Sequence, residues 1–239
     1  MGRAFEYRKA SKLKRWGNMS RIFPKLAKSI TMAAKLGSSD PQMNSFLRTA
    51  ILNAKAQNLP KANIDSAIKR ATSKDLTNFV EVNFEGRGPN GVLIFIETAT
   101  DNNTRTVANL KMIFSRNGGE LVPTGSLEFM FDRKAIFEFD NSDKTIDIEE
   151  LELDLIDLGL EDIIEEEGRV YIYSDYKDFN NLNSKFEELN IDLKKAKLER
   201  LSNSPKIFSK NQLDEINILL DKLEEDDDVQ EIYTNISYI

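Results

Sequence analysis

The residues that most clearly suggest a chemical role are the Lys and Arg side chains concentrated in the first third of the chain. Residues 1–75 hold 16 Lys and Arg against 4 Asp and Glu, a net charge of +12, whereas residues 76–239 hold 17 against 36, a net charge of −19. A cation that contacts a phosphate releases counterions condensed on the nucleic acid, which gives salt-sensitive, sequence-independent affinity. The division therefore predicts a module that binds nucleic acid or a ribonucleoprotein, joined to an acidic body. An anionic membrane fits less well, because the cationic helix faces lack bulky apolar partners.

Helical spacing separates many of these cations from the apolar residues beside them. Over residues 20–36, Arg21, Lys25 and Lys28 fall opposite a stripe that includes Ile22 and Leu26. Trp16 either stacks on an unpaired base or belongs to the thin core of a helix over residues 4–16. The residues predicted to contact phosphate are Arg8, Lys9, Lys12, Lys14, Arg15, Arg21, Lys25, Lys28, Lys35, Arg48, Lys61, Lys69 and Arg70.

Two further polar segments have both a functional and a plain interpretation. Glu224, Glu225, Asp226, Asp227 and Asp228 fall at the end of a predicted helix, where acids oppose the helix dipole. They suggest docking of a basic partner or of a divalent cation, and the simpler interpretation is a solvated helix end. The segment TDNNTRT, residues 100–106, offers either anion contacts near Arg105 or an ordinary capped helix.

The composition excludes several classes of enzyme. The chain has no Cys and no His, so thiolate nucleophiles, Ser-His-Asp catalysis and Cys- or His-ligated metals are excluded. The stretch GRGPNG, residues 86–91, is followed by strand-forming residues and not by a helix, so it predicts a hairpin turn rather than a dinucleotide site. We expect neither enzymatic activity nor a cofactor nor a metal, and catalysis by magnesium at Asp226 to Asp228 is the least favoured hypothesis. No apolar run approaches the roughly 20 residues of a spanning helix, which favours the cytoplasm.

The periodicity predicts an α+β fold in three domains. Amphipathic helices are expected from about Ser20 to Gly37, from the Asp40-Pro41 cap with Met43 in the buried stripe, and from Pro60. Strands and helices follow from Phe79, with a break in the strand near Asp132-Arg133. We predict a basic helical bundle over residues 1–78 and an α/β sandwich of ferredoxin-like type over 79–132 and 205–239. A second such sandwich, over 133–204, is inserted in the first, and consecutive domains are the simpler alternative.

Two sets of positions together carry a specific resemblance. Those in the basic part are Phe23, Lys25, Leu26, Ile30, Ala33, Ala34, Lys35, Asn44, Leu47, Arg48, Ala50, Ile51, Asn58, Pro60, Lys61, Asn63, Ile64, Ala67, Ile68, Lys69 and Arg70. Those in the body are Thr100, Asp101, Asn102, Arg105, Thr106, Gly118, Gly119, Gly125, Ser126, Asp226, Asp227, Asp228, Val229, Gln230, Tyr233 and Asn235. At these positions the chain resembles the YebC/PmpR family, which includes the mitochondrial translational activator of cytochrome oxidase. The resemblance covers essentially the whole chain, except that the family usually opens Gly-His-Ser-Lys-Trp where this chain has Gly2-Arg3-Ala4-Phe5-Glu6.

The resemblance implies a helical domain followed by two α/β domains and a non-enzymatic cytoplasmic regulator. Some members of the family resemble DNA-binding transcriptional regulators, and others act on the ribosome, where they ease synthesis of proline-rich stretches. We expect a DNA-binding transcriptional regulator, with a ribosome-associated translation factor that contacts ribosomal RNA as the alternative.

Overall fold

The computed structural model describes residues 19–72 and 79–237, so the helix predicted over residues 4–16 lies outside the described residues. The chain divides into two compact units. The first unit takes in the described residues of Met1–Lys28, Asp75–Asp132 and Leu201–Ile239, and the second takes in those of Ser29–Lys74 and Arg133–Arg200. The two units share a mixed helix and sheet architecture, and each contains one four-stranded sheet.

The sheet of the first unit has the strand order β3-β1-β2-β9 with antiparallel neighbours throughout. Its strands are β1 (Val80–Arg87), β2 (Leu93–Thr100), β3 (Glu120–Val122) and β9 (Val229–Thr234). The short helix η1 (Pro89–Gly91) joins β1 to β2, and Asn90 and Gly91 adopt φ values of 60° and 76°, which Asn and Gly tolerate best. GRGPNG is thus a hairpin turn, as the sequence predicts.

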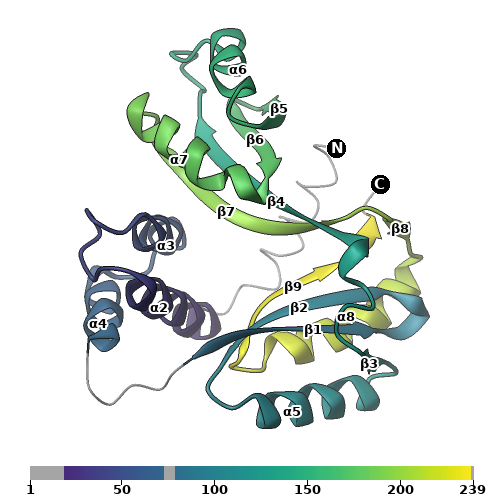
Figure 1. The fold of residues 1–239 in the computed structure, drawn as a ribbon. Coiled ribbons are helices and arrows are strands. Elements are labelled where there is room, and N and C mark those ends of the chain that lie inside the picture. The colour runs from purple at the N-terminus through teal and green to yellow at the C-terminus, as the bar shows by residue number, and fades with distance from the viewer. Residues whose placement is uncertain (1–18, 73–78, 238–239) are drawn as a thin grey trace. The chain divides into compact units, whose positions relative to one another are not determined.

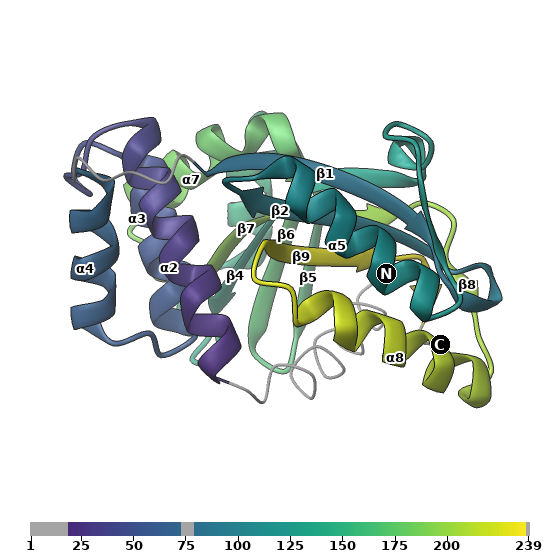
Figure 2. The same cartoon turned by 90° about the horizontal axis from the view of Figure 1, so that it is seen from below.

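Two helices cover one face of this sheet, α5 (Asn103–Arg116) and α8 (Lys210–Glu224), as Figures 1 and 2 show. Both begin at side-chain caps: Asn102 accepts from the backbone N–H of Arg105, and Ser209 forms a capping box with Gln212. Apolar residues from both helices and from the sheet make one core, which includes Phe84, Ile94, Leu110, Phe114 and Leu220. A helix η2 (Glu128–Met130) and a two-stranded parallel pair, β8 (Lys206–Ile207) with β10 (Ile236–Ser237), complete the unit.

The sheet of the second unit has the strand order β5-β6-β4-β7. Its elements follow the succession strand-helix-strand-strand-helix-strand: β4 (Phe131–Asp140), α6 (Ile148–Ile156), β5 (Leu160–Glu166), β6 (Arg169–Asp175), α7 (Phe179–Glu188) and β7 (Leu193–Ser202), with the short helix η3 (Tyr176–Asp178) before α7. Phe137 belongs to the core of this unit. Its ring centroid lies 5.1 Å from the ring centroid of Phe179 and 5.0 Å from the ring centroid of Phe186. The strand break predicted near Asp132-Arg133 is wrong, because β4 continues through it, and the boundary between the units falls there instead.

Three helices precede the sheets: α2 (Met19–Leu36), α3 (Ser45–Ala56) and α4 (Lys61–Ala71). The prediction that α3 starts at Asp40-Pro41 is wrong. Asn44 is the cap, since its side-chain oxygen accepts from the N–H of Leu47 while its amide donates to the carbonyls of Ala33 and Ser38. Met43 therefore precedes the helix and is 79% exposed, contrary to its predicted burial.

Within the second unit, α3 is attached to β7 by the side chain of Asn53. Its amide donates to the carbonyl of Ala196 at 2.7 Å, and its oxygen accepts from the N–H of Ala196 at 3.2 Å. Leu52, beside it, packs against the core that contains Phe137. The three-domain division made from the sequence stays a prediction.

We expect Asn53→Ala to lower the free energy of unfolding by about 1–3 kcal/mol, because it leaves the two backbone groups of Ala196 without their partners. Urea denaturation followed by circular dichroism measures the change. Asn63→Ala, on the exposed face of α4, is the control and should change stability by less than about 0.5 kcal/mol. Equal effects of the two substitutions would contradict a specific role for Asn53.

Candidate nucleic-acid interface

Helix α4 displays three cations toward solvent, near its two ends. Lys61 lies in the first turn and Lys69 and Arg70 lie in the last turn, and all three are exposed, with the exposed Asp65 one turn from each lysine. None of the three forms an ion pair within residues 19–72 and 79–237. The three cations are therefore accessible in the described part of the protein, and their contact with phosphate stays a prediction.

Two other predicted phosphate contacts are less accessible. The guanidinium of Arg48 donates to both carboxylate oxygens of Glu187 at 3.1 Å and to the carbonyls of Pro41 and Gln42. This set of bonds ties α3 to α7 and to the turn before α3 within the second unit. Lys35 lies half-buried in the last turn of α2.

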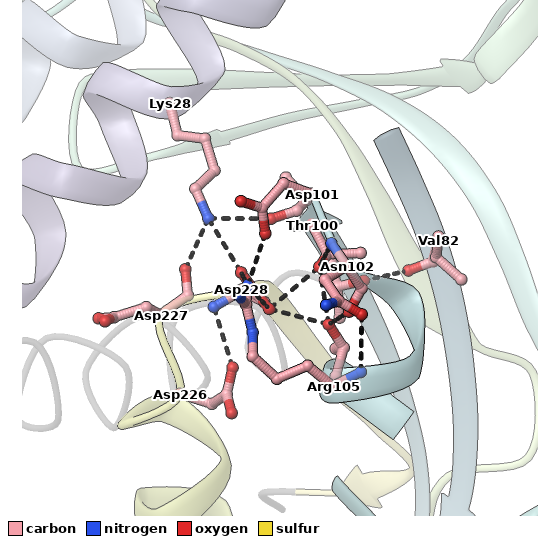
Figure 3. Close-up of polar contacts among 12 residues, drawn as sticks. Lys28, Val82, Thr100, Asp101, Asn102, Arg105, Asp226, Asp227 and Asp228 are labelled. Atoms are coloured by element: carbon pink, nitrogen blue, oxygen red, sulfur yellow. Dashed lines mark hydrogen bonds and ion pairs between the residues drawn. The ribbon is translucent and has the colours of Figure 1, made fainter. Parts of the chain in front are cut away.

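The cations at the start of α2 contact the acidic end of α8, within the first unit. Lys25 Nζ donates to the carbonyl of Glu224 at 3.1 Å, and Lys28 Nζ donates to that of Asp227 at 2.8 Å. Lys28 also donates to the carbonyl of Ala99 at 2.9 Å, and Arg21 forms an ion pair with Glu225 at 3.4 Å. Figure 3 shows Lys28 reaching toward Asp227 and Asp228.

This contact has an electrostatic cause. The last carbonyls of a helix lack intrahelical partners and carry partial negative charge, so cations are favoured there. Burial lowers the pKa of Lys25 below its usual value, and the carboxylates of Glu231, Glu224 and Asp226 counteract only part of that effect. Acids that oppose the dipole of α8 are thus compensated by a basic helix of the same chain.

Asp228 is the centre of a buried polar network beside these lysines. Its carboxylate accepts from the hydroxyls of Thr106 at 2.8 Å and Thr100 at 3.1 Å, and from the guanidinium of Arg105 at 3.1 Å. Lys28 Nζ lies 3.5 Å from its other oxygen. Figure 3 shows these groups converging from β2, α5, α2 and the loop before β9. Arg105 also forms an ion pair with Asp101 at 2.7 Å, so its guanidinium is already paired with two carboxylates of the same chain.

The ionisation of Asp228 follows from these bonds. Burial alone would raise its pKa, but the hydrogen bonds from Thr106, Arg105 and Thr100 outweigh it and hold the pKa below the usual value. Asp226 is occupied as well, since its two oxygens accept from the N–H of Asp228 and from the side chain of Asn109. Among the residues that the structure describes, no group of three or more acidic side chains is arranged to hold a metal.

One buried acid has no counterpart in the sequence predictions. Glu85 on β1 is only 1% exposed, and its carboxylate accepts from the N–H of Gly125 at 2.6 Å and from the N–H of Leu127. It thereby fixes the loop that precedes η2. The signal that could have indicated this buried carboxylate is the position of Glu85 inside the strand-forming run FVEVNFEG, between Phe84 and Gly86.

The predicted contacts Arg8, Lys9, Lys12, Lys14 and Arg15 lie outside the described residues. The described part of the protein combines two four-stranded sheets with helices, and one of those helices, α4, bears exposed cations. No helix in that part is long and apolar enough to span a membrane.

Comparison with known proteins identifies the family. Residues 3–74 match the TACO1/YebC protein N-terminal domain, and residues 79–236 match the TACO1/YebC second and third domain. The chain belongs to the TACO1/YebC family.

Relatives of high identity support this assignment. A protein of Sulfurimonas denitrificans is 61% identical over 99% of this chain and 100% of its own length, and one of Wolinella succinogenes is 59% identical with the same coverage. Both bear the name "Probable transcriptional regulatory protein". The crystal structure of a conserved hypothetical protein from Aquifex aeolicus is similar, with a TM-score of 0.75 and 32% identity over 93% of this chain and 92% of that one.

We expect Asp228→Asn to lower the free energy of unfolding at neutral pH by about 3 kcal/mol. The substitution leaves Lys28 and Arg105 facing an uncharged amide, and it removes an acceptor from the buried hydroxyls of Thr100 and Thr106. Chemical denaturation measures the loss. Asp227→Asn is the matched control, since the Asp227 side chain is exposed and only its carbonyl contacts Lys28. A loss as large in the control would contradict the central role of Asp228.

The pH dependence of stability should also distinguish the wild-type protein from Asp228→Asn. Because the folded-state pKa of Asp228 is depressed, its stabilisation is fully present above the unfolded-state value of about 3.9 and is lost as pH falls through the folded value. The stability difference between wild type and Asp228→Asn should therefore shrink below about pH 4. Urea titrations between neutral and acidic pH check this, and a constant difference would contradict it.

Proposed function

We propose that the protein is a DNA-binding transcriptional regulator that acts in the cytoplasm without enzymatic chemistry. The observation that carries the proposal is the set of three cations on α4, Lys61, Lys69 and Arg70, which are exposed and form no ion pair within the described residues. Exposed cations attract phosphates, and the affinity they supply does not depend on base sequence.

Charge and family names support the same proposal. Residues 1–75 carry a net charge of +12 in a chain whose total is −7. The relatives from Sulfurimonas and Wolinella are named as probable transcriptional regulators. The acidic body would repel DNA over most of its surface, so the primary contact would fall on the basic part of the molecule.

The predicted phosphate contacts divide into two groups under this proposal. The exposed cations of α4 make the primary contact. Lys25 and Lys28 already donate to carbonyls at the end of α8 and near β2, so they contribute to the general potential rather than through direct bonds. The cations before residue 19 join the first group as a prediction from sequence.

We also propose that three domains carry out this function: a basic helical domain over residues 1–78, a discontinuous α/β domain over 79–132 and 205–239, and an inserted ferredoxin-like domain over 133–204. The strand order β5-β6-β4-β7 and the alternation of its elements support the last assignment.

We expect replacement of Lys61, Lys69 and Arg70 by Gln to weaken binding to duplex DNA and to reduce the slope of log K against log[salt] by about 2–3, because about 0.9 is lost for each phosphate contact. Fluorescence anisotropy of a labelled duplex, titrated at several salt concentrations, measures both quantities. Gln keeps helix propensity close to that of Lys and Arg, so α4 should persist.

The control replaces Lys111, Arg116 and Lys210, which are exposed on α5 and α8, by Gln. It removes the same charge from helices outside α4 and should leave the salt slope nearly unchanged. Crosslinking of the tagged protein in cells, with sequencing of the recovered DNA and RNA, identifies the target. Recovery of ribosomal RNA without DNA would overturn the proposal in favour of a translation factor.

A further inference from the structure

A second site of positive charge lies on the acidic body, around Tyr176 in the second unit. The Tyr176 side chain is 40% exposed, whereas Phe179, the first residue of α7, is buried. The guanidinium carbon of Arg133 lies 5.4 Å from the centroid of its ring, and Lys177 Nζ lies 5.6 Å from it. Both distances fall within the range of cation–π attraction.

The strand register explains why these residues meet. In the antiparallel ladder of β4 and β6, Ala135 pairs with Ser174 and Lys134 with Asp175. Arg133 and Tyr176 come directly after the last pair of this ladder, Tyr176 as the first residue of η3, and there the Arg133 guanidinium lies over the Tyr176 ring. Lys134 bonds Glu161 instead.

Acids lie next to both cations in sequence, Asp132 before Arg133 and Asp178 after Lys177, but neither forms an ion pair with them. Asp175 accepts from the backbone N–H of Lys177. Glu161 is held by Lys134. Neither Arg133 nor Lys177 forms an ion pair with any residue that the structure describes, although residues 76–239 hold 36 acids. Two like charges on one ring repel each other, and an anion bound between them would relieve that repulsion.

We propose that Arg133, Tyr176 and Lys177 form a site for single-stranded nucleic acid. An unpaired base stacks on the exposed part of the Tyr176 ring and on the Arg133 guanidinium, while the flanking phosphates contact Arg133 and Lys177. The inference rests on the proposed function, since it adds an unpaired segment to the nucleic acid that α4 contacts.

The combination of groups selects unpaired over paired strands. In a duplex the faces of the bases are covered by stacking, so an aromatic ring gains nothing there beyond the phosphate contacts. A single strand offers base faces as well as phosphates, and stacking tolerates any base sequence. The ligand is therefore a melted, looped or terminal stretch of nucleic acid, without sequence preference at this site.

Binding of a labelled oligothymidylate of about 12 nucleotides to the full chain tests the site, with a duplex of equal length alongside. Tyr176→Ala should weaken single-strand binding by about 5- to 160-fold, the range for loss of one stacked base, with duplex binding nearly unchanged. Tyr176→Phe should retain single-strand binding, since the ring remains. Arg133→Gln with Lys177→Gln should reduce the single-strand salt slope by about 1.4, or 0.7 for each phosphate.

Phe129→Ala is the matched control, because Phe129 is an aromatic residue that is 71% exposed in the first unit, and it should leave both ligands unaffected. Single-strand affinity that is the same in wild type and Tyr176→Ala would overturn the site while leaving duplex binding through α4 intact. Loss of duplex binding on replacing the α4 cations, together with no effect at Tyr176, would likewise overturn the site and support the proposed function. Wild-type protein that binds neither ligand would overturn both proposals.

Discussion

The buried carboxylate of Asp228 is the constraint around which the first unit is organised. It accepts hydrogen bonds from Thr100 and Thr106 and from Arg105, and so fixes the end of β2 and the first turn of α5 to the loop before β9. A buried charge of this kind is tolerable only when fully bonded, because an unpaired one costs several kcal/mol. Since its partners come from distant parts of the sequence, the network specifies one arrangement of these elements and also positions Lys28.

Positive charge in this protein serves two different purposes. Along the first half of α2 it neutralises the acidic end of α8, and on α4 it faces solvent. The net charge of a segment does not reveal this difference. A basic region can be partly committed to holding the molecule together, and only the remainder acts on a ligand.

Local patterns in the sequence predicted most of the fold, because the Gly-rich turns, caps and hydrophobic periods are short-range signals. The GRGPNG hairpin is an example. The start of α3 could not be predicted, because Asn44 is selected as the cap by its bonds to Ala33 and Ser38 in the preceding turn. Pairing of Lys28 with Asp227, or of Arg133 with Tyr176, depends on tertiary approach and strand register, which periodicity does not encode.

Three of the four boundaries between the two units fall inside α2, β4 and β7, each of which continues unbroken across its boundary, and the fourth, between Lys74 and Asp75, lies outside the described residues. Neither unit therefore corresponds to one continuous stretch of gene, and recombination at any of these three points would sever a helix or a strand. Exchange of either unit alone is disfavoured, and the Sulfurimonas and Wolinella relatives match the chain over their entire length.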